Sequence, residues 1–383
     1  MTSPSDAASS RPSTDLPSQP PEVDAIESEH ALPQVDLSFL KLSSNYHQLD
    51  TEDVPEAFID SPQQPPQDTP LSDLLHDGHF RRAAGASLVQ LSQCPPEDTL
   101  RLLQLLYTRL ACLVLTARPD LAAAEGAALT DFLARNPPGA AELVPLIPWE
   151  LRLLLVRLQS ITAADNGRRG VMSLYSLSGE VRAHLAEATE SENRAQIELW
   201  SNRLADLGLR VADTLVEMGE LETATRHLDT LVGVHGNELA YRKALLRLRV
   251  GDVGGARAAV NKIQNATRRL ALDALLDVAN GDMSVAVNKW QFQDDNNANA
   301  MFSSNLAVGL LYTGRIAQAR QLFETMIQTS PVFPGVLFNL GTVYELCTEQ
   351  AIQRKTDLVN TVAAKQPQPA SGGWEKPSFD FKL

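Results

Sequence analysis

Four six-residue stretches of this sequence share one pattern: Gly, a polar residue, an apolar residue, two variable residues and Ala. They begin at Gly219, Gly251, Gly281 and Gly314, so successive copies lie 32, 30 and 33 residues apart. A period of about 30–34 residues is typical of helix-turn-helix units stacked into a solenoid. Gly ends the first helix of a unit because it takes the left-handed conformation without a Cβ clash. The Ala leaves space where two helix backbones approach each other.

The fourth copy fits a tetratricopeptide unit best, because Phe323 and Pro331 follow its Gly and Ala at the expected offsets. A fifth copy begins far upstream, at Gly78. Residues 338–346 have the apolar face of a first helix without a Gly–Ala continuation, which predicts a half-unit that caps the array. Apolar residues recur at helical spacing along most of the chain. The pattern therefore predicts an all-α, tetratricopeptide-repeat (TPR) helical solenoid. The alternative is an irregular helical bundle with coincidental glycines.

The first 70 residues differ in composition from the rest of the chain. They contain 11 of the 23 prolines, and thirteen acidic residues against two basic ones, which is −11 of the formal net charge of −14. Such a segment has too little apolar surface to offset its ordering entropy, so we expect a disordered acidic N-terminal tail. The remaining 313 residues carry only −3. That near-neutral balance argues against a nucleic-acid partner.

Composition and periodicity together predict four parts. In chain order these are a disordered acidic, proline-rich tail (1–70), an irregular helical region with one TPR-like hairpin (71–190), a TPR solenoid (191–365), and a flexible link with a C-terminal apolar tag (366–383). Within the second part, residues 165–180 are predicted to form a loop that is too long for a TPR turn.

No residue pattern predicts catalysis. The sequence has no HExxH, GxxxxGK[ST] or GxSxG motif and no GxGxxG after a strand. His76 and His79 have metal-ligand spacing, but a solvated pair at a helix end is the more common meaning of that spacing. We therefore expect no enzyme activity, no cofactor, no metal and no small-molecule substrate.

Three scattered cysteines are typical of a reducing cytosol rather than of a disulfide scaffold. The polar, acidic N-terminus is unlike a signal peptide. No window of about 18 consecutive apolar residues predicts a membrane span. Together these features predict a cytoplasmic protein.

Candidate interface residues occur in two places. Arg168 and Arg169 stand in a Gly-bounded stretch of the predicted loop, where they either meet an acidic partner or anionic lipid, or are simply solvated. The last ten residues concentrate large apolar side chains, which anchor either to a neighbouring subunit or to the chain's own last repeat: Trp374, Phe379, Phe381 and Leu383. In the predicted tail, Ser61 and Thr69 each precede a proline, which marks either proline-directed phosphorylation sites or a coincidence of composition.

Three functions remain open from the residues alone. A co-chaperone that grips an acidic C-terminal peptide needs Lys, Arg and Asn on consecutive inner helices. Asn305 and Asn339 occupy similar positions, but Lys243 and Arg247 lie in the wrong unit to complete that set. An enzyme with an unrecognised site is the second possibility. A stable subunit of a larger assembly is favoured, because the tail, the loop and the apolar tag are appendages that a catalytic domain does not need.

Residues 197–383 resemble the TPR subunit family of the TRAPP membrane-tethering complex (the trafficking protein particle complex subunit 12 family). The resemblance is carried by ELWSNRLADLGLRVADTLVEMG, NNANAMFSSNLAVGLLYTGR, GVLFNLGTVYELCTEQAIQRKTDLVNTVAAK and the closing SFDFKL. NGRRGVMSL is similar to a Gly-Arg-Arg-Gly loop ahead of the family's repeats. Residues 71–196 match loosely, and the acidic tail does not match.

The resemblance implies a non-catalytic scaffold subunit of a TRAPPIII-type vesicle-tethering complex. Such a complex activates a Rab GTPase through other subunits and serves ER-to-Golgi transport and autophagy. The implied partners are core and accessory TRAPP subunits, with indirect links to the Rab GTPase and to Golgi membranes. The implied location is cytoplasmic, peripheral to Golgi and ER–Golgi intermediate membranes.

Overall fold

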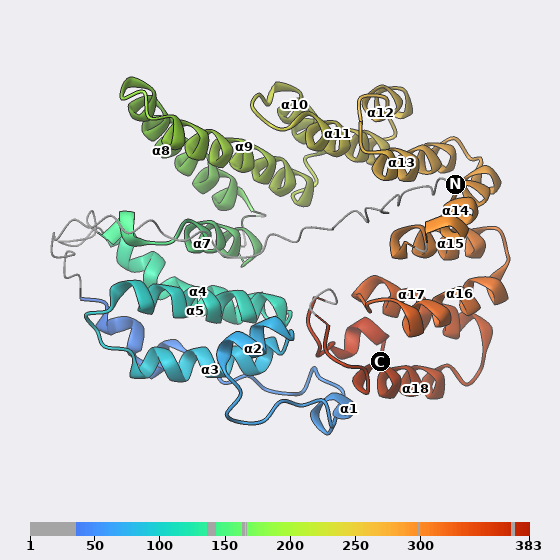
Figure 1. The fold of residues 1–383 in the computed structure, drawn as a ribbon, viewed down its shortest axis with the longest axis horizontal. Coiled ribbons are helices and arrows are strands. Elements are labelled where there is room, and N and C mark those ends of the chain that lie inside the picture. Colours follow the sequence, from blue (N-terminus) through green and yellow to red (C-terminus); the bar gives the residue numbers. More distant parts are fainter. Residues whose placement is uncertain (1–35, 136–142, 163–164, 166, 298, 369–371) are drawn as a thin grey trace, which may run out of the picture.

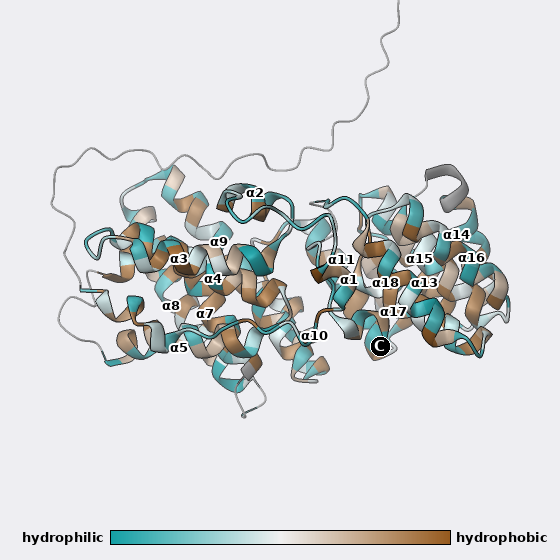
Figure 2. Cartoon of the chain, turned by 90° about the horizontal axis from the view of Figure 1, so that it is seen from below, coloured by the Kyte–Doolittle hydropathy of each residue, from teal (hydrophilic) through white to brown (hydrophobic). Residues whose placement is uncertain are grey.

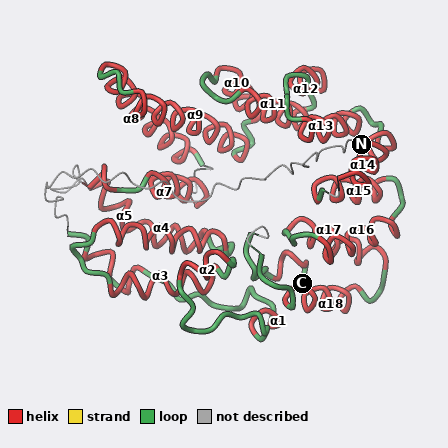
Figure 3. Tube along the Cα trace, viewed as in Figure 1, coloured by secondary structure: helices red, strands yellow, loops and turns green. Residues whose placement is uncertain are grey.

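The computed structural model describes residues 36–135, 143–162, 165, 167–297, 299–368 and 372–383. Throughout these ranges the chain consists of α-helices and short 3-10 helices, with no β-strand (Figure 1, Figure 3). The helices follow one another around a ring, and α18 returns to contact α1 (Figure 1). The predicted all-α TPR helical solenoid is confirmed.

The first half of the solenoid contains η1 (Ser38–Lys41), η2 (Ser43–Asn45), α1 (Glu56–Ile59), α2 (Leu71–His76), α3 (Phe80–Gln93), α4 (Thr99–Leu115), α5 (Pro119–Arg135), η3 (Val144–Leu146), α7 (Trp149–Thr162), α8 (Arg168–Glu190) and α9 (Arg194–Glu217). The second half contains α10 (Leu221–Thr230), α11 (Gly236–Val250), α12 (Val253–Val260), α13 (Ala266–Ala279), α14 (Met283–Asn297), α15 (Ala300–Tyr312), α16 (Ile316–Thr329), α17 (Pro334–Cys347), α18 (Ala351–Ala363) and η5 (Ser378–Phe381).

Each helix packs mainly against the helices that precede and follow it in the chain. The core is accordingly a series of adjoining clusters. Leu272 and Leu276 belong to the cluster of α11–α13, and Trp290 and Phe302 belong to the next cluster, of α13–α16. Figure 2 shows hydrophobic and hydrophilic residues alternating along the helices. This is the pattern of helices that bury one face and expose the other.

The repeated Gly–Ala phrase has the geometry that the sequence predicts. In all five copies the glycine has a positive φ between 77° and 91° and ends or follows the first helix of a hairpin. In all five the alanine has no exposed surface, because the second helix packs closely there. The pairs are Gly78 with Ala83, Gly219 with Ala224, Gly251 with Ala256, Gly281 with Ala286, and Gly314 with Ala319.

Other hairpins turn without a glycine. Ala117 between α4 and α5 and Glu192 between α8 and α9 take the left-handed conformation with φ of 61° and 52°. The predicted half-unit at 338–346 is completed by α18, so α17 and α18 form a full hairpin through an extended Thr348. These hairpins escape the sequence pattern because their turns use residues that do not mark a turn.

The structure differs from the predicted tail in residues 36–70. These residues are helical or turn-forming and enter the cores of other segments, whereas residues 1–35 lie outside the described residues. Leu37 and Leu40 are buried in the cluster of α4, α5 and α7, and Val54 and Phe58 are buried in the cluster of the last hairpins. A few apolar residues are enough to order this segment, because they pack into cores that other helices form and do not need to form a core of their own.

The predicted loop at 165–180 is also corrected. Helix α8 begins at Arg168, directly after Gly167, which has a φ of 84°. Gly170 lies inside the helix rather than in a loop. A Cβ at Gly170 would lie 2.4 Å from the Cβ of Ser160, so this glycine permits α8 to cross α7 closely. Glycine here serves packing, although a glycine-rich stretch usually indicates a turn. Residue 166 is outside the described residues.

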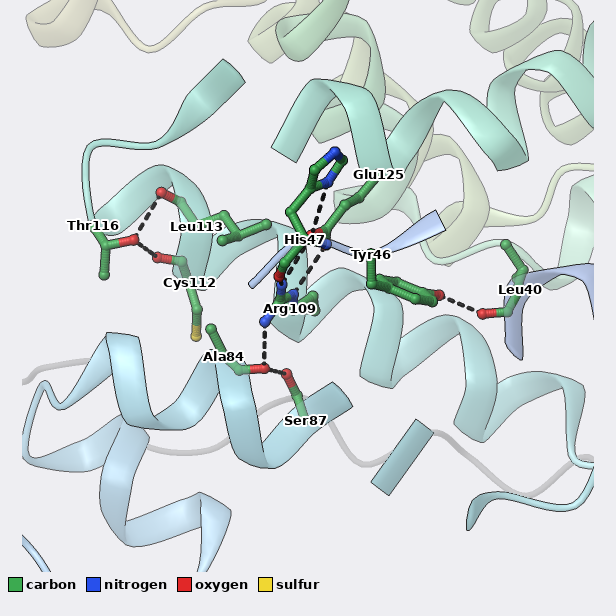
Figure 4. A network of polar contacts seen from close by, with 10 residues as sticks. All are labelled: Leu40, Tyr46, His47, Ala84, Ser87, Arg109, Cys112, Leu113, Thr116 and Glu125. Carbon is green, nitrogen blue, oxygen red and sulfur yellow. Dashed lines mark hydrogen bonds and ion pairs between the residues drawn. The ribbon is translucent and has the colours of Figure 1, made fainter. Parts of the chain in front are cut away.

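A buried ion pair fixes the segment that precedes α1 (Figure 4). The guanidinium of Arg109 on α4 donates to both carboxylate oxygens of Glu125 on α5, at 2.9 and 2.8 Å. It also donates to the backbone oxygens of Ala84, at 3.0 Å, and His47, at 2.8 Å. The His47 amide donates to Glu125 at 2.9 Å. Because both charged side chains are almost fully buried, each needs all of these partners.

The first and last parts of the described chain meet and close the ring. Phe58 on α1 is fully buried and contacts the rings of Trp374 and Phe381. The amide of Trp374 donates to Gly78 at 2.9 Å, and the hydroxyl of Ser61 donates to Ala363 at 2.7 Å. Ser61 is therefore an internal hydrogen-bond donor of the closure in this structure, which is not the state of an open phosphorylation site. Thr69 donates to Pro66 at 2.9 Å at the surface.

Replacing the turn glycine Gly251 by alanine tests the role of the repeated phrase. No atom lies within 4 Å of an added Cβ, so the effect is purely conformational. We expect Gly251→Ala to lower the free energy of unfolding by about 1 kcal/mol, because the left-handed conformation strains a residue with a Cβ. Gly85→Ala, inside α3 with equally open space, is the matched control and should stabilise by about 0.5–1 kcal/mol. Urea denaturation followed by circular dichroism measures both. Equal changes in the unfolding free energy of the two variants would contradict the assignment of Gly251 as a turn glycine.

Replacing Glu125 by glutamine tests the buried ion pair. Glu125→Gln leaves the guanidinium of Arg109 buried without a counter-charge, and we expect a loss of about 3 kcal/mol or more of unfolding free energy. Hydrogen exchange should show that the amides of residues 37–47 lose protection first. Glu222→Gln breaks a fully exposed pair with Arg226 and should change the unfolding free energy by less than about 0.5 kcal/mol. Retained protection at residues 37–47 in Glu125→Gln would count against the anchoring role.

Candidate protein interface

The C-terminal segment is partly core and partly surface. Trp374 packs edge-on against Phe58, with ring centres 5.3 Å apart, and also against His79, at 5.0 Å. Its indole N–H donates to the backbone oxygen of Lys365 at 3.1 Å. Phe381 has no exposed surface. The sequence left two anchoring sites open for these two residues, a neighbouring subunit or the chain's own last repeat. In the structure both residues pack on the last repeat and on α1.

Gly341 explains how the segment fits against α17. A Cβ at Gly341 would lie 3.0 Å from the backbone oxygen of Phe381, so the missing side chain permits the backbone of η5 to lie directly on the helix. His79, which the spacing with His76 left as a solvated residue, is 3% exposed because Trp374 covers it. Burial lowers the pKa of His79, so this contact favours the neutral imidazole.

Charged side chains fasten the edge of the closing contact. Arg81 on α3 pairs with Glu375 at 2.9 Å. Glu345 on α17 pairs with Lys355 on α18 at 2.6 Å and with Lys382 at 2.5 Å. Hydrogen bonds from these two lysines lower the pKa of Glu345. The ammonium of Lys355 also donates to the backbone oxygen of Lys382 at 2.9 Å. Glu345 thus holds the last hairpin and the C-terminal segment together.

Phe379 and Leu383 point to solvent, with exposed fractions of 59% and 56%. Phe338 on α17 is 49% exposed, and the ammonium of Lys382 lies 5.2 Å above the centre of its ring. The amide of Lys382 donates to the backbone oxygen of Phe379. Lys382 thus links the three exposed apolar residues, through its ammonium to Phe338, through its amide to the backbone of Phe379 and through the chain to Leu383. We call these four residues the C-terminal surface. Exposed apolar side chains that gather in one place are typical of protein-interaction sites.

Arg168 and Arg169 do not belong to this surface. Both are exposed in the first turn of α8, and Arg169 pairs with Asp165 at 3.5 Å. The structure therefore brings Trp374 and Phe381 together in the core, places Phe379 and Leu383 on the surface, and leaves the two arginines on another part of the ring. Sequence reasoning missed Phe58 and His79, which complete the closure. No local signal identifies them, because their partners lie about 300 residues away.

The basic residues considered for a peptide clamp are already paired. Lys243 and Arg247 on α11 both contact Asp229, each at 3.1 Å. Arg247 also lies 3.6 Å from Asp252. A cavity of about 440 Å³ adjoins these groups, and Lys243 and Arg247, two of the three cations that line it together with Lys262, are already paired.

Among the residues that the structure describes, no group of three or more His, Cys, Asp or Glu side chains could hold a metal ion. None of the described helices is long and apolar enough to cross a membrane.

The sequence of the chain is similar to that of a subunit of a trafficking complex. The chain is 24% identical over 255 residues to trafficking protein particle complex subunit 12 of Mus musculus, and 23% identical over 251 residues to that of Homo sapiens. Each alignment covers 58% of this chain. The chain is similar to TRAPP subunit 12. It spans about a third of the length of these relatives, 31% and 34%. No family model matches.

Solved structures similar to the chain are TPR proteins. A TPR protein of Parabacteroides merdae aligns with 14% identity and a TM-score of 0.41, covering 67% of this chain and 91% of its own. The TPR domain of P58(IPK) aligns with 14% identity and a TM-score of 0.22, covering 79% and 94%. The TPR assignment rests on the Gly and Ala geometry of the chain itself rather than on these superpositions.

Alanine substitutions separate the two halves of the C-terminal segment. Trp374→Ala removes a buried indole, and we expect a loss of about 3–5 kcal/mol of unfolding free energy. Phe379→Ala removes an exposed ring and should change it by less than about 0.5 kcal/mol. Urea denaturation measures both variants, and hydrogen exchange in α1 and α18 shows whether the ring opens. A large effect of Phe379→Ala, or a negligible one of Trp374→Ala, would contradict the division into core and surface.

Proposed function

We propose that the chain is a non-catalytic scaffold subunit of a TRAPP complex of the TRAPPIII type. The observation that carries the proposal is the similarity to TRAPP subunit 12 over 58% of the chain. The ring-shaped solenoid supports it, because stacked helix pairs offer long surfaces for other chains. The chain would hold accessory subunits to the core of the complex.

In this proposal other subunits perform the nucleotide exchange on a Rab GTPase, and this chain contributes contacts only. Its attachment to Golgi and ER–Golgi intermediate membranes would run through its partners. The processes served are ER-to-Golgi transport and autophagy. The location would be cytoplasmic and peripheral to those membranes.

The C-terminal surface is the contact that we assign to a neighbouring subunit. Phe379 and Leu383 are large and exposed. Phe379 lies on the 3-10 helix η5 and Leu383 follows that helix by two residues, in a segment that Trp374 and Phe381 anchor to the core. Side chains presented on a fixed backbone lose little further conformational entropy when they bind. The surface therefore has the apolar side chains and the rigidity of an interface.

Affinity purification of the tagged full-length chain from its native cytosol tests this function. We expect core and accessory TRAPP subunits in constant ratio by mass spectrometry. Recovery of a chaperone, or of no partner, would overturn the scaffold proposal and favour a TPR co-chaperone.

Point substitutions test the surface better than a deletion of residues 374–383, which would remove the buried Trp374 and Phe381. We expect Phe379→Ser combined with Leu383→Ser to reduce subunit recovery at least tenfold, which corresponds to about 1.4 kcal/mol of binding. Val232→Ser, at an apolar residue that is 87% exposed elsewhere on the ring, is the matched control and should leave recovery unchanged. Unchanged recovery with the double variant would exclude this surface as the contact.

A further inference from the structure

A stack of aromatic rings and cations occupies the place where α7, α8 and α9 meet. The guanidinium of Arg203 on α9 lies 4.7 Å from the ring centre of Trp149 on α7, and 4.7 Å from that of Trp200 on α9. His184 on α8 stacks on Trp200, with ring centres 4.6 Å apart and planes 16° from parallel. The guanidinium of Arg152 lies 5.8 Å from Trp149. Rings from two helices thus lie against the guanidinium of Arg203.

The hydrogen-bond donors of Arg203 have no partner among the residues that the structure describes. Within the described part of the chain Arg203 donates no hydrogen bond and joins no ion pair. The arginines around it differ, since Arg152 pairs with Glu180 at 2.5 Å and Arg210 pairs with Asp206 at 2.7 Å. A guanidinium carries five N–H donors in its plane. When rings cover its faces, the edge that carries these donors is what remains for a ligand.

The electrostatic surroundings of Arg203 leave its charge poorly compensated. Burial lowers the pKa of this guanidinium, while the carboxylate of Glu150 acts in the opposite direction. Glu150 does not approach closely enough to form an ion pair with it among the described contacts. A cation that is half-buried and lacks a close anion gains from an added one, because partial desolvation strengthens the attraction.

We propose that Arg203 is the receptor for a carboxylate of an acidic peptide segment on a partner protein. The planar guanidinium matches a carboxylate with two parallel hydrogen bonds, and the two tryptophans fix its orientation before the ligand arrives. A single carboxylate suits the site better than a phosphate dianion does. Arg152, the other cation here, is already paired with Glu180 at 2.5 Å, so only one guanidinium is left for the ligand, and one guanidinium matches one carboxylate. The proposal does not depend on which complex the chain joins.

Titration of the purified full-length chain with acetylated, amidated hexaglutamate tests the proposal, with hexaglutamine as the uncharged probe. The fluorescence of Trp149 and Trp200 reports on the site, and isothermal titration calorimetry gives the affinity. We expect saturable binding of hexaglutamate, at least tenfold weaker binding by Arg203→Gln, and no binding of hexaglutamine. The control is Arg257→Gln, because Arg257 is also unpaired in the described structure but is exposed rather than half-buried and has no ring beside it. It should bind as the unmodified chain does.

Two further variants keep the test decisive if Arg203→Gln unfolds. Arg203→Lys keeps the charge but loses the planar fork, and should bind several-fold more weakly. Glu150→Gln removes the carboxylate that acts electrostatically on Arg203, and this variant should bind hexaglutamate more tightly. Inorganic phosphate should compete poorly. The proposal is overturned by equal affinities of the unmodified and Arg203→Gln chains, by an absence of saturable binding, or by tighter binding of phosphate than of hexaglutamate.

Discussion

The burial of Phe58 against the C-terminal segment is the contact on which the shape of the molecule depends. A solenoid leaves an apolar face uncovered at each end, because its terminal units have only one neighbour. Here each end covers the other. Val54 and Phe58 fill the cluster of the last hairpins, while Trp374 covers His79 at the start of α3. The ion pairs of Arg81 with Glu375 and of Glu345 with two lysines then fix the edge of the contact.

The features that the sequence predicts are local, and those that it does not predict are distant. Gly251 and Ala256 lie five residues apart in one hairpin, so their spacing carries the geometry directly. Phe58 and Trp374 lie more than 300 residues apart, and no local sequence pattern around either residue predicts their contact. Composition also averages over a segment. It predicts disorder for residues 36–70, although a few buried leucines and one phenylalanine there enter cores that other segments supply.

The candidate interface can likewise be predicted from the sequence only in part. The apolar character of the last ten residues is visible in the sequence, but which ring faces inward is not. Trp374 faces the core from the segment before η5. Within η5, Phe381 faces the core and Phe379 faces solvent, because a 3-10 helix repeats about every three residues and presents its residues to different sides. The surroundings of Arg203 are also only partly predictable from the sequence. Trp200 lies three residues before Arg203 on α9, but Trp149 reaches Arg203 only because α7 packs near α9, which no spacing in the chain encodes.

Closure of the ring also has a consequence for the order in which the chain folds. The hairpins form from contacts between neighbours, which are fast because little chain must be ordered to make them. The contact of Ser61 with Ala363 spans 302 residues, so much more of the chain must be brought together to form it. The entropic penalty for this length is still modest, because each doubling of a closed loop adds only about 0.6 kcal/mol. We therefore expect the solenoid to assemble first and the ring to close last. Until then both ends expose apolar surface, so the slow step of folding is also the interval in which the chain is most prone to aggregate.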